Sequence, residues 1–208
     1  MRKLLIVLAA LTTLVVAGPA LAAKIKSGTS TVTLSEGAST ALTAHGIVVT
    51  PIAPATGGDG SFTLPIARGH INKKNRGYLL HKGGLKLTKG EKSISFRHPL
   101  VVVGKKGGVL AAQTGRKCHR GQVRGHGRGH GHRAVVCRVT FRAVARLSDL
   151  SRDGTTATAT LKLTKYAARQ LNKLAGTDFA KAGDLLGTGK VVVSDSATPT
   201  APAPPVAG

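Results

Sequence analysis

The sequence predicts a mainly β protein, either an antiparallel β-sandwich or a curved sheet, with two short helices. Three observations carry this prediction. Apolar and polar residues alternate in several short runs, Gly and Lys separate those runs, and aromatic residues make up only 3% of the chain. A core without Trp must be built from Val, Leu, Ile and Ala, and the β-branched residues among these pack well on a pleated sheet.

The chain opens with the pattern of a secretory signal peptide. Arg2 and Lys3 precede the apolar run 4–17, and small residues follow at 20–23. This run is shorter than the ~20 apolar residues that span a bilayer, which argues against the alternative of a retained membrane anchor. We therefore expect residues 1–23 to be cleaved, no transmembrane segment afterwards, and a product that is secreted, extracellular or associated with the cell wall.

The rest of the chain predicts a single β-rich domain over residues 24–193. Runs of alternating apolar and polar residues, each typical of a strand with one buried face, lie at 61–64, 85–88, 93–97 and 139–147. Gly-containing segments between the runs predict the turns of an antiparallel meander, at 83–84, 89–90 and 105–108.

Two segments resemble each other and predict the short helices. Each follows an alternating strand, and the helices are expected over 36–45 and 165–175. Ser35 and Thr164 then occupy the N-cap positions, where a side-chain oxygen accepts a hydrogen bond from the first turn. The match fits an internal duplication, and it equally fits two strand-to-helix turns built in the same way.

The last residues, 194–208, are rich in Pro, Ala and Thr. A segment of this composition cannot bury a core, so we expect a disordered tail. A spacer or a tail that threads the cell wall is the alternative.

Cys118 and Cys137 are the only cysteines in the chain. Export would bring both to an oxidising compartment, which predicts a disulfide between them; the alternatives are free thiols or a Cys-containing metal site. The segment that they enclose carries imidazoles that could ligate Zn, Cu or Ni, at His119, His126, His130 and His132. Neighbouring Arg charges oppose a cation, so a solvated basic loop is the favoured interpretation and a pH sensor is a second one.

Positive charge dominates the composition, with 31 Lys and Arg against 8 Asp and Glu and a net charge of +23. Such a field favours polyanionic partners, although it also serves solubility. Export argues against nucleic acid as the physiological partner and favours anionic cell-envelope polymers. The candidate residues for that contact are Lys73, Lys74, Arg76, Lys105, Lys106, Arg120, Arg124, Arg128 and Arg133.

The sequence offers no catalytic motif. We find no paired carboxylates, no Gly-x-Ser-x-Gly elbow, no phosphate-binding Gly loop and no His-Glu-x-x-His. The prediction is therefore a binding protein rather than an enzyme.

Three segments in the middle of the chain, 61–72, 77–87 and 94–102, resemble the Htaa-domain family. The motif that carries the resemblance has the form Gly-x-Leu-x-His-x-Gly-Gly-Leu and begins at Gly77. The family consists of secreted or surface-held β-rich modules of actinobacteria, some of which take up haem. The resemblance, which extends over about residues 30–193, implies the same fold and location here.

One family feature is missing. Haem-binding members carry a Trp and a Ser-Phe-x-x-Tyr element whose Tyr ligates the iron, and this sequence contains neither. Tyr78 and His81 are the candidate replacement ligands, although Tyr78 also fits a cross-strand packing role. We therefore predict an exported, non-catalytic binding protein of Htaa type that binds haem or a metal at the cell surface. The alternative is a structural or adhesion-like basic protein held to envelope polymers.

Overall fold

The computed structural model describes residues 23–72, 74–123 and 132–194. The predicted signal peptide and tail lie outside these residues, apart from Ala23 and Ser194. The helices are α1 (Glu36–Ala44) and α2 (Lys165–Ala175). The strands are β1 (Ala23–Ile25), β2 (Gly28–Leu34), β3 (Val48–Ile52), β4 (Thr56–Gly58), β5 (Ser61–Ile71), β6 (Gly77–His81), β7 (Gly84–Lys89), β8 (Lys92–Gly104), β9 (Gly107–Val123), β10 (His132–Asp153), β11 (Thr156–Leu163) and β12 (Leu185–Val193).

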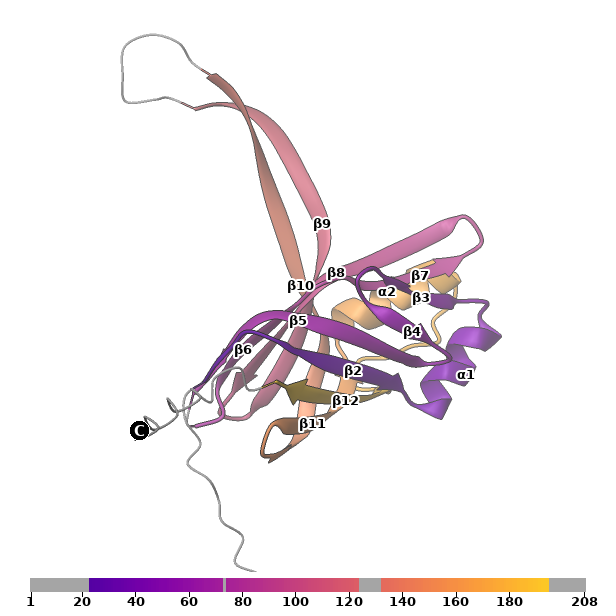
Figure 1. Cartoon of the computed structure of the whole chain (residues 1–208). Coiled ribbons are helices and arrows are strands. Elements are labelled where there is room, and N and C mark those ends of the chain that lie inside the picture. The colour runs from indigo at the N-terminus through magenta and orange to yellow at the C-terminus, as the bar shows by residue number, and fades with distance from the viewer. Residues whose placement is uncertain (1–22, 73, 124–131, 195–208) are drawn as a thin grey trace, which may run out of the picture.

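Eight of these strands close into an antiparallel barrel, in the order β5, β2, β12, β11, β10, β9, β8, β6 and back to β5 (Figure 1). The short strand β6 completes the ring because it pairs with β5 on one side and with β8 on the other. The predicted mainly β fold with two short helices is confirmed, but the sandwich or open curved sheet is wrong. Alternating apolar and polar residues show that a strand has one buried face. Strands of a sandwich and of a barrel share this pattern, so it cannot distinguish the two folds.

The remaining strands extend the barrel at its margins. Strand β8 is shared, because its first half pairs with β7 and its second half pairs with β6. Strand β3 pairs with β7, and β1 and β4 both pair with β5. The expected turns are confirmed at the β6–β7, β7–β8 and β8–β9 connections.

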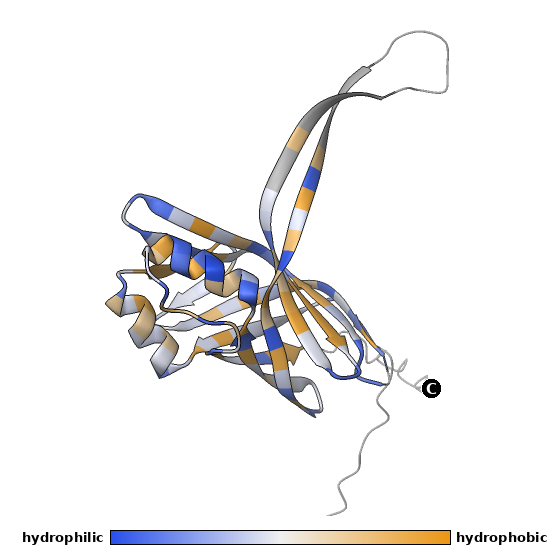
Figure 2. Cartoon of the chain, turned by 180° about the vertical axis from the view of Figure 1, so that it is seen from behind, coloured by the Kyte–Doolittle hydropathy of each residue, from blue (hydrophilic) through white to orange (hydrophobic). Residues whose placement is uncertain are grey.

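The two ends of the barrel differ. Helices α1 and α2 cover one end, where Leu42, Leu171 and Leu174 join the main hydrophobic cluster. The other end carries the β5–β6, β8–β9 and β10–β11 turns, and the start of β1 and the end of β12 lie there too. Figure 2 shows apolar positions concentrated along the barrel strands. Neither helix in the described residues is long and apolar enough to cross a membrane.

Both predicted helix caps are confirmed. The Ser35 Oγ accepts a hydrogen bond from the Ala38 backbone N–H, and the Thr164 Oγ1 accepts one from Ala167, each at 3.2 Å. Helix α2 ends at Gly176, whose left-handed φ of 78° suits glycine. Helix α1 ends one residue before its expected limit, because His45 forms its C-cap.

Replacing Thr164 with alanine is expected to lower the free energy of unfolding by about 1–2 kcal/mol. The change removes the N-cap bond and a second bond of 2.7 Å that the Thr164 hydroxyl donates to the Ala143 carbonyl. Denaturant unfolding measures the loss. Thr164→Ser keeps a hydroxyl and should recover most of it; equal losses in both variants would contradict the capping role.

Strands β9 and β10 also form a ribbon that projects from the barrel (Figure 1). Among the described residues, the part of β9 after Gln113 pairs only with β10, and the part of β10 before Ala145 pairs only with β9. Cys118 and Cys137 are paired in register on this ribbon and form the predicted disulfide. The bond therefore joins the two strands of the ribbon rather than parts of the barrel wall.

Candidate functional site

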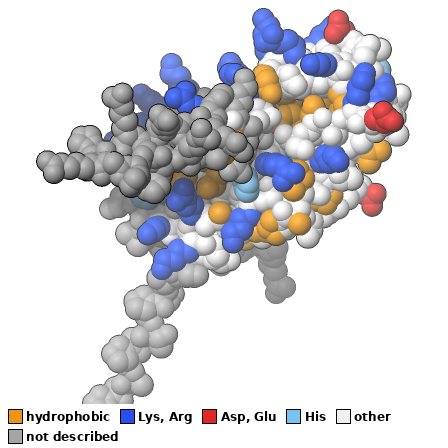
Figure 3. Space-filling view, turned by 90° about the horizontal axis from the view of Figure 1, so that it is seen from above, with side chains coloured by type: hydrophobic (Ala, Val, Ile, Leu, Met, Phe, Trp, Pro, Cys, Tyr) orange, Lys and Arg blue, Asp and Glu red, His pale blue; other side chains and the backbone are white. Residues whose placement is uncertain are grey.

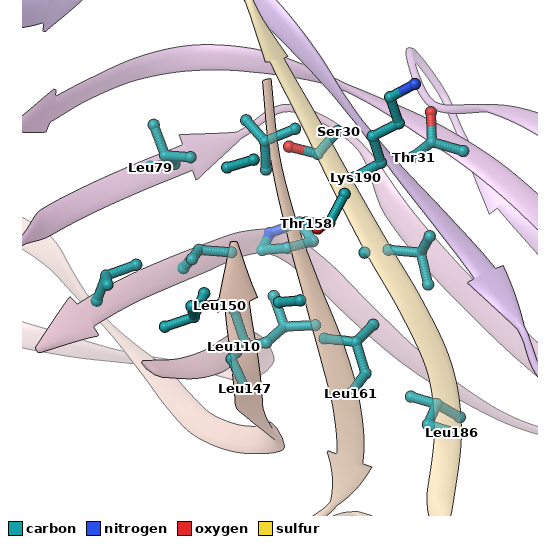
Figure 4. Close-up of a pocket in the computed structure, with 18 of the residues that line it drawn as sticks. Ser30, Thr31, Leu79, Leu110, Leu147, Leu150, Thr158, Leu161, Leu186 and Lys190 are labelled. Carbon is teal, nitrogen blue, oxygen red and sulfur yellow. The ribbon is translucent and has the colours of Figure 1, made fainter. Parts of the chain in front are cut away.

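A cavity of about 1930 Å³ runs through the barrel interior. Aliphatic side chains form much of its wall, among them Leu79, Leu110, Leu147, Leu161 and Leu186 from five different strands (Figure 4). The volume exceeds the ~300–1,000 Å³ of ordinary ligand pockets, and eight-stranded barrels can hold one small ligand. We therefore take this cavity as the candidate binding site.

The sequence of β11 explains part of this space. From Thr158 on, the more exposed Thr and Lys positions alternate with the buried residues Ala159, Leu161 and Leu163. The inward positions nearest the turn are Ala157 and Ala159, and Gly189 faces the cavity from the neighbouring strand. These residues fill little of the interior, so the barrel keeps a cavity where larger side chains would have closed it.

The cavity has a floor and a mouth. The floor is made by the helices, through residues such as Ala41, Leu42 and Leu171. The mouth lies at the opposite end, among the turns that connect the barrel strands. A ligand would therefore enter from the turn end and extend toward the helices.

Among the described residues, one pair of polar side chains in the cavity lining is buried. Ser30 on β2 and His81 on β6 are 7% and 2% exposed, and the Ser30 Oγ lies 2.6 Å from the His81 Nε2. The His81 Nδ1 lies 2.9 Å from the Pro99 carbonyl oxygen. A carbonyl can only accept, so the proton is on Nδ1, and Nε2 accepts the hydroxyl proton of Ser30.

Burial holds His81 in its neutral form. Desolvation lowers the pKa of the imidazole, and the hydrogen bond to Pro99 opposes this effect only in part. A neutral imidazole whose Nε2 carries a lone pair is the form that can ligate a metal ion. The barrel therefore presents one ligand-competent nitrogen to the cavity.

The lowered pKa of His81 predicts that the fold loses stability as the pH falls. In the unfolded chain His81 takes up a proton near pH 6.5, whereas in the folded chain it does so only at its lowered pKa. The free energy of unfolding therefore falls as the pH drops from about 6.5 to that lowered pKa. Thermal melting between pH 8 and pH 4.5 measures this. His81→Gln should flatten the profile in this window, and His70→Gln, an exposed control on β5, should not.

Positive charge surrounds the mouth. The described cavity lining holds eight cations and three carboxylates, of which Lys190 lies along β12 away from the turns and Asp184 lies toward the helices. The other seven cations and two carboxylates line the mouth, which leaves a formal excess of five positive charges there: Lys24, Lys26, Lys74, Arg76, Lys105, Lys106 and Arg152 against Asp149 and Asp153. We call these seven cations the rim. The hydroxyl groups of Ser148 and Thr160 lower the pKa of Asp149, so that carboxylate stays ionised. The rim therefore favours an anionic group at the mouth.

Hydrogen bonds order two of the rim turns. The Asn72 Oδ1 accepts from the backbone N–H groups of Lys74 and Arg76, at 2.9 and 3.0 Å. The guanidinium of Arg152 donates to the Asn75 Oδ1 at 2.9 Å and so links the β5–β6 turn to the end of β10. These hydrogen bonds therefore hold Lys74, Arg76 and Arg152 of the rim in fixed positions relative to one another.

The two candidate iron ligands lie on opposite faces of β6. His81 shares the inward face with Leu79, whereas Tyr78 points outward and is 41% exposed. The structure therefore brings His81 to the cavity and leaves Tyr78 on the outer wall, next to Val102 in register. The cross-strand packing role considered for Tyr78 fits this position.

The histidines of the basic loop are not brought to the cavity. His126 and His130 lie outside the described residues, and for His119 and His132 only the strand register on the ribbon is described. Within the described part of the chain, no group of three or more His, Cys, Asp or Glu side chains is placed to hold a metal ion.

The proposed polyanion-binding residues fall into two groups. Lys74, Arg76, Lys105 and Lys106 belong to the rim. Lys73, Arg124 and Arg128 lie outside the described residues, and Arg120 and Arg133 are placed only by strand register. Figure 3 shows one outer face, on which Lys and Arg side chains are spread among apolar ones.

Sequence reasoning missed several residues of the site. Ser30 sits in a Thr- and Ser-rich strand with no distinguishing motif, and Lys24 and Arg152 reach the rim from distant parts of the chain. Side chains alternate between the two faces of a strand, and this alternation alone places Leu79 and His81 on one face of β6 and Tyr78 on the other. The contact between Ser30 and His81 depends on the pairing of both β2 and β6 with β5, which places the two residues on either side of that strand.

No protein-family model matches the chain, and no curated protein matches it. Solved structures from Corynebacterium glutamicum are similar to it. The C-terminal domain of HtaA has a TM-score of 0.53 at 14% identity, covering 82% of this chain and 99% of that domain. The N-terminal domain of HtaA has a TM-score of 0.54 at 14% identity, covering 84% and 99%.

A third structure, the heme binding protein HtaB, has a TM-score of 0.50 at 16% identity and covers 83% of this chain and 94% of that one. Identities this low establish a shared fold. They confirm the predicted resemblance to Htaa domains at that level.

Proposed function

We propose that this chain, which shares the fold of the HtaA and HtaB domains, is a non-catalytic binding protein that holds haem in its barrel cavity. The observation that carries the proposal is an apolar cavity with one ligand-competent imidazole inside and a cationic rim at its mouth. HtaB, a heme binding protein that shares this fold, supports the same ligand.

The residues of the cavity fit the chemistry of haem. The porphyrin is largely apolar, its propionates are anionic, and its iron accepts an imidazole nitrogen. The aliphatic wall, the rim and His81 match these three parts in turn. Among the described residues that line the cavity, His81 is the only one of a type that ligates haem iron, since no Tyr, Cys or Met lies there.

Iron ligation requires one local change. The His81 Nε2 is hydrogen bonded to the Ser30 hydroxyl, so that hydroxyl must turn away before the nitrogen can reach iron. The Nδ1 bond to Pro99 can remain, and it orients the ring as an outer partner orients a metal-ligating histidine. The chain thus supplies both the ligand and the group that holds it.

The test is a titration of the purified protein with ferric haem, followed through the haem absorbance band. Saturable one-to-one binding supports the proposal, whereas only non-saturable changes at all haem concentrations would overturn it. Tyr78→Ala and a His126, His130 and His132 triple-alanine variant should bind as the parent does. Loss of binding in either variant would move the iron ligand out of the cavity.

We also propose that the protein works outside the cytoplasm. The signal-peptide pattern and the Cys118–Cys137 disulfide support this location. The envelope-polymer alternative is not favoured, because four of its candidate cations, Lys74, Arg76, Lys105 and Lys106, belong to the rim. Mass spectrometry of the exported protein should find a new N-terminus near Ala23 and no free thiol; an uncleaved chain would contradict this proposal.

A further inference from the structure

We propose that the cavity also takes a long-chain fatty acid, with the hydrocarbon chain along the barrel axis and the carboxylate at the rim. The inference rests on the same cavity as the proposed function, but it does not use the iron ligand. Three observations lead to it: the hydrogen-bonding state of the interior, the depth of the cavity, and the charge at its mouth.

The interior requires no polar partner from a ligand. Ser30 and His81 bond to each other, and the second His81 nitrogen bonds to Pro99. Among the described residues, no buried side-chain nitrogen or oxygen lacks a hydrogen-bond partner. A hydrocarbon chain would therefore leave every internal hydrogen bond intact, whereas an iron ligand must break the one between Ser30 and His81.

The cavity is deep, and aliphatic side chains line it from the mouth to the helices, with Thr31, Thr158 and Lys190 among them. Strand β11 has eight residues, which at about 3.3 Å each and the usual barrel tilt span roughly 20 Å along the axis. Val193 and Ile71 line the mouth end, and Leu147 and Leu161 line the middle. The two aromatic rings in the lining, Phe96 and Phe179, belong to the cluster beside the helices. This shape suits an extended alkyl chain.

The mouth suits a carboxylate. The rim gives this end its excess of five positive charges, and none of its cations lies on the cavity floor. A fatty acid has one anionic group at one end, so the charge at the rim and the apolar depth define one direction of entry. The carboxylate would meet Lys74, Arg76 and Lys105 while the chain extends toward the helices.

The first experiment is a chain-length series. The purified protein is loaded with a fluorescent polyene fatty acid, cis-parinaric acid, and saturated fatty acids of increasing length displace it. Each added methylene should raise the affinity roughly three- to fourfold until the chain reaches the floor near Leu171. The methyl ester of each acid should bind at least tenfold more weakly. Affinities independent of chain length, or equal for acid and ester, would overturn the inference.

Two variants test the direction of entry. Lys74→Glu with Arg76→Glu reverses two rim charges and should weaken the acids while leaving the esters unchanged. The matched control is Arg68→Glu with Arg146→Glu, which reverses two exposed charges outside the cavity lining and should leave both series unchanged. If both double variants weakened the acids equally, the effect would come from the net charge of the protein, and the proposed role of the rim would be wrong.

A third variant tests the depth. Ala159→Phe places a ring in the middle of the wall and should shorten the best-bound acid, with circular dichroism as the check on folding. The rim variants keep the test decisive if this one fails to fold. Haem titrated in parallel separates the two proposals. Displacement by fatty acids without haem binding removes the proposed function alone, and haem binding without displacement removes this inference alone.

Discussion

Replacing His81 with alanine is expected to weaken ferric haem binding by at least about 10-fold and to remove the absorbance signature of imidazole ligation. The magnitude is a lower bound, because changing even an outer partner of a metal ligand costs about 10- to 100-fold in affinity. Among the described residues that line the cavity, no other side chain of an iron-ligating type could replace it. Spectrophotometric titration of parent and variant measures both effects.

Three controls separate ligation from damage to the fold. Iron-free protoporphyrin should bind the parent and His81→Ala alike, because it uses only the wall and the rim. His70→Ala removes an exposed imidazole from the neighbouring strand and should change nothing. Ser30→Ala frees the His81 Nε2 and should keep or strengthen haem binding. A His81→Ala protein with the parent haem spectrum would contradict ligation by this residue.

Replacing Phe62 with alanine is expected to lower the free energy of unfolding by about 3–5 kcal/mol. Phe62 is 1% exposed and is the largest fully buried side chain among the described residues. It lies on β5, in register with Val32 on β2 and Gly57 on β4, and truncation leaves a cavity that the neighbouring strands cannot fill without moving. Denaturant unfolding gives the value.

Phe141→Ala is the matched control for Phe62→Ala. Phe141 lies on the projecting part of β10 and is 42% exposed, so its truncation should cost less than about 1 kcal/mol. Similar losses for the two variants would mean that the barrel does not pack around Phe62. A loss for Phe62→Ala below about 1 kcal/mol would mean the same.

The local structure was predictable because it depends on neighbours in the sequence. Ser35 and Thr164 are N-cap residues followed by amphipathic segments, and both helices begin where these signals place them. Alternation around Phe62 and Phe96 places strands with one buried face there, and Gly-containing turns separate them. These signals act over a few residues, where side-chain direction and backbone preference decide the outcome.

Closure of the sheet was not predictable in this way. It depends on the pairing of β12 with β2 and of β6 with β8, and no local pattern states which strands become neighbours. The cavity follows from closure together with the small inward side chains of Ala157 and Ala159. The Ser30–His81 contact spans 51 positions in the sequence. Such a site appears only after the long-range pairings are known.

The chain enters and leaves the described fold at the same end as the cavity mouth. Ala23 is in register with Ile71 beside the β5–β6 turn, and the Val193 N–H donates to the Thr155 carbonyl at the β10–β11 turn. A reporter protein or surface linker fused at Ala23 or Ser194 would therefore lie beside the mouth and obstruct the entry of a ligand. The β7–β8 hairpin around Gly90 lies away from the mouth and is the better insertion point for a label, because it leaves the entrance clear.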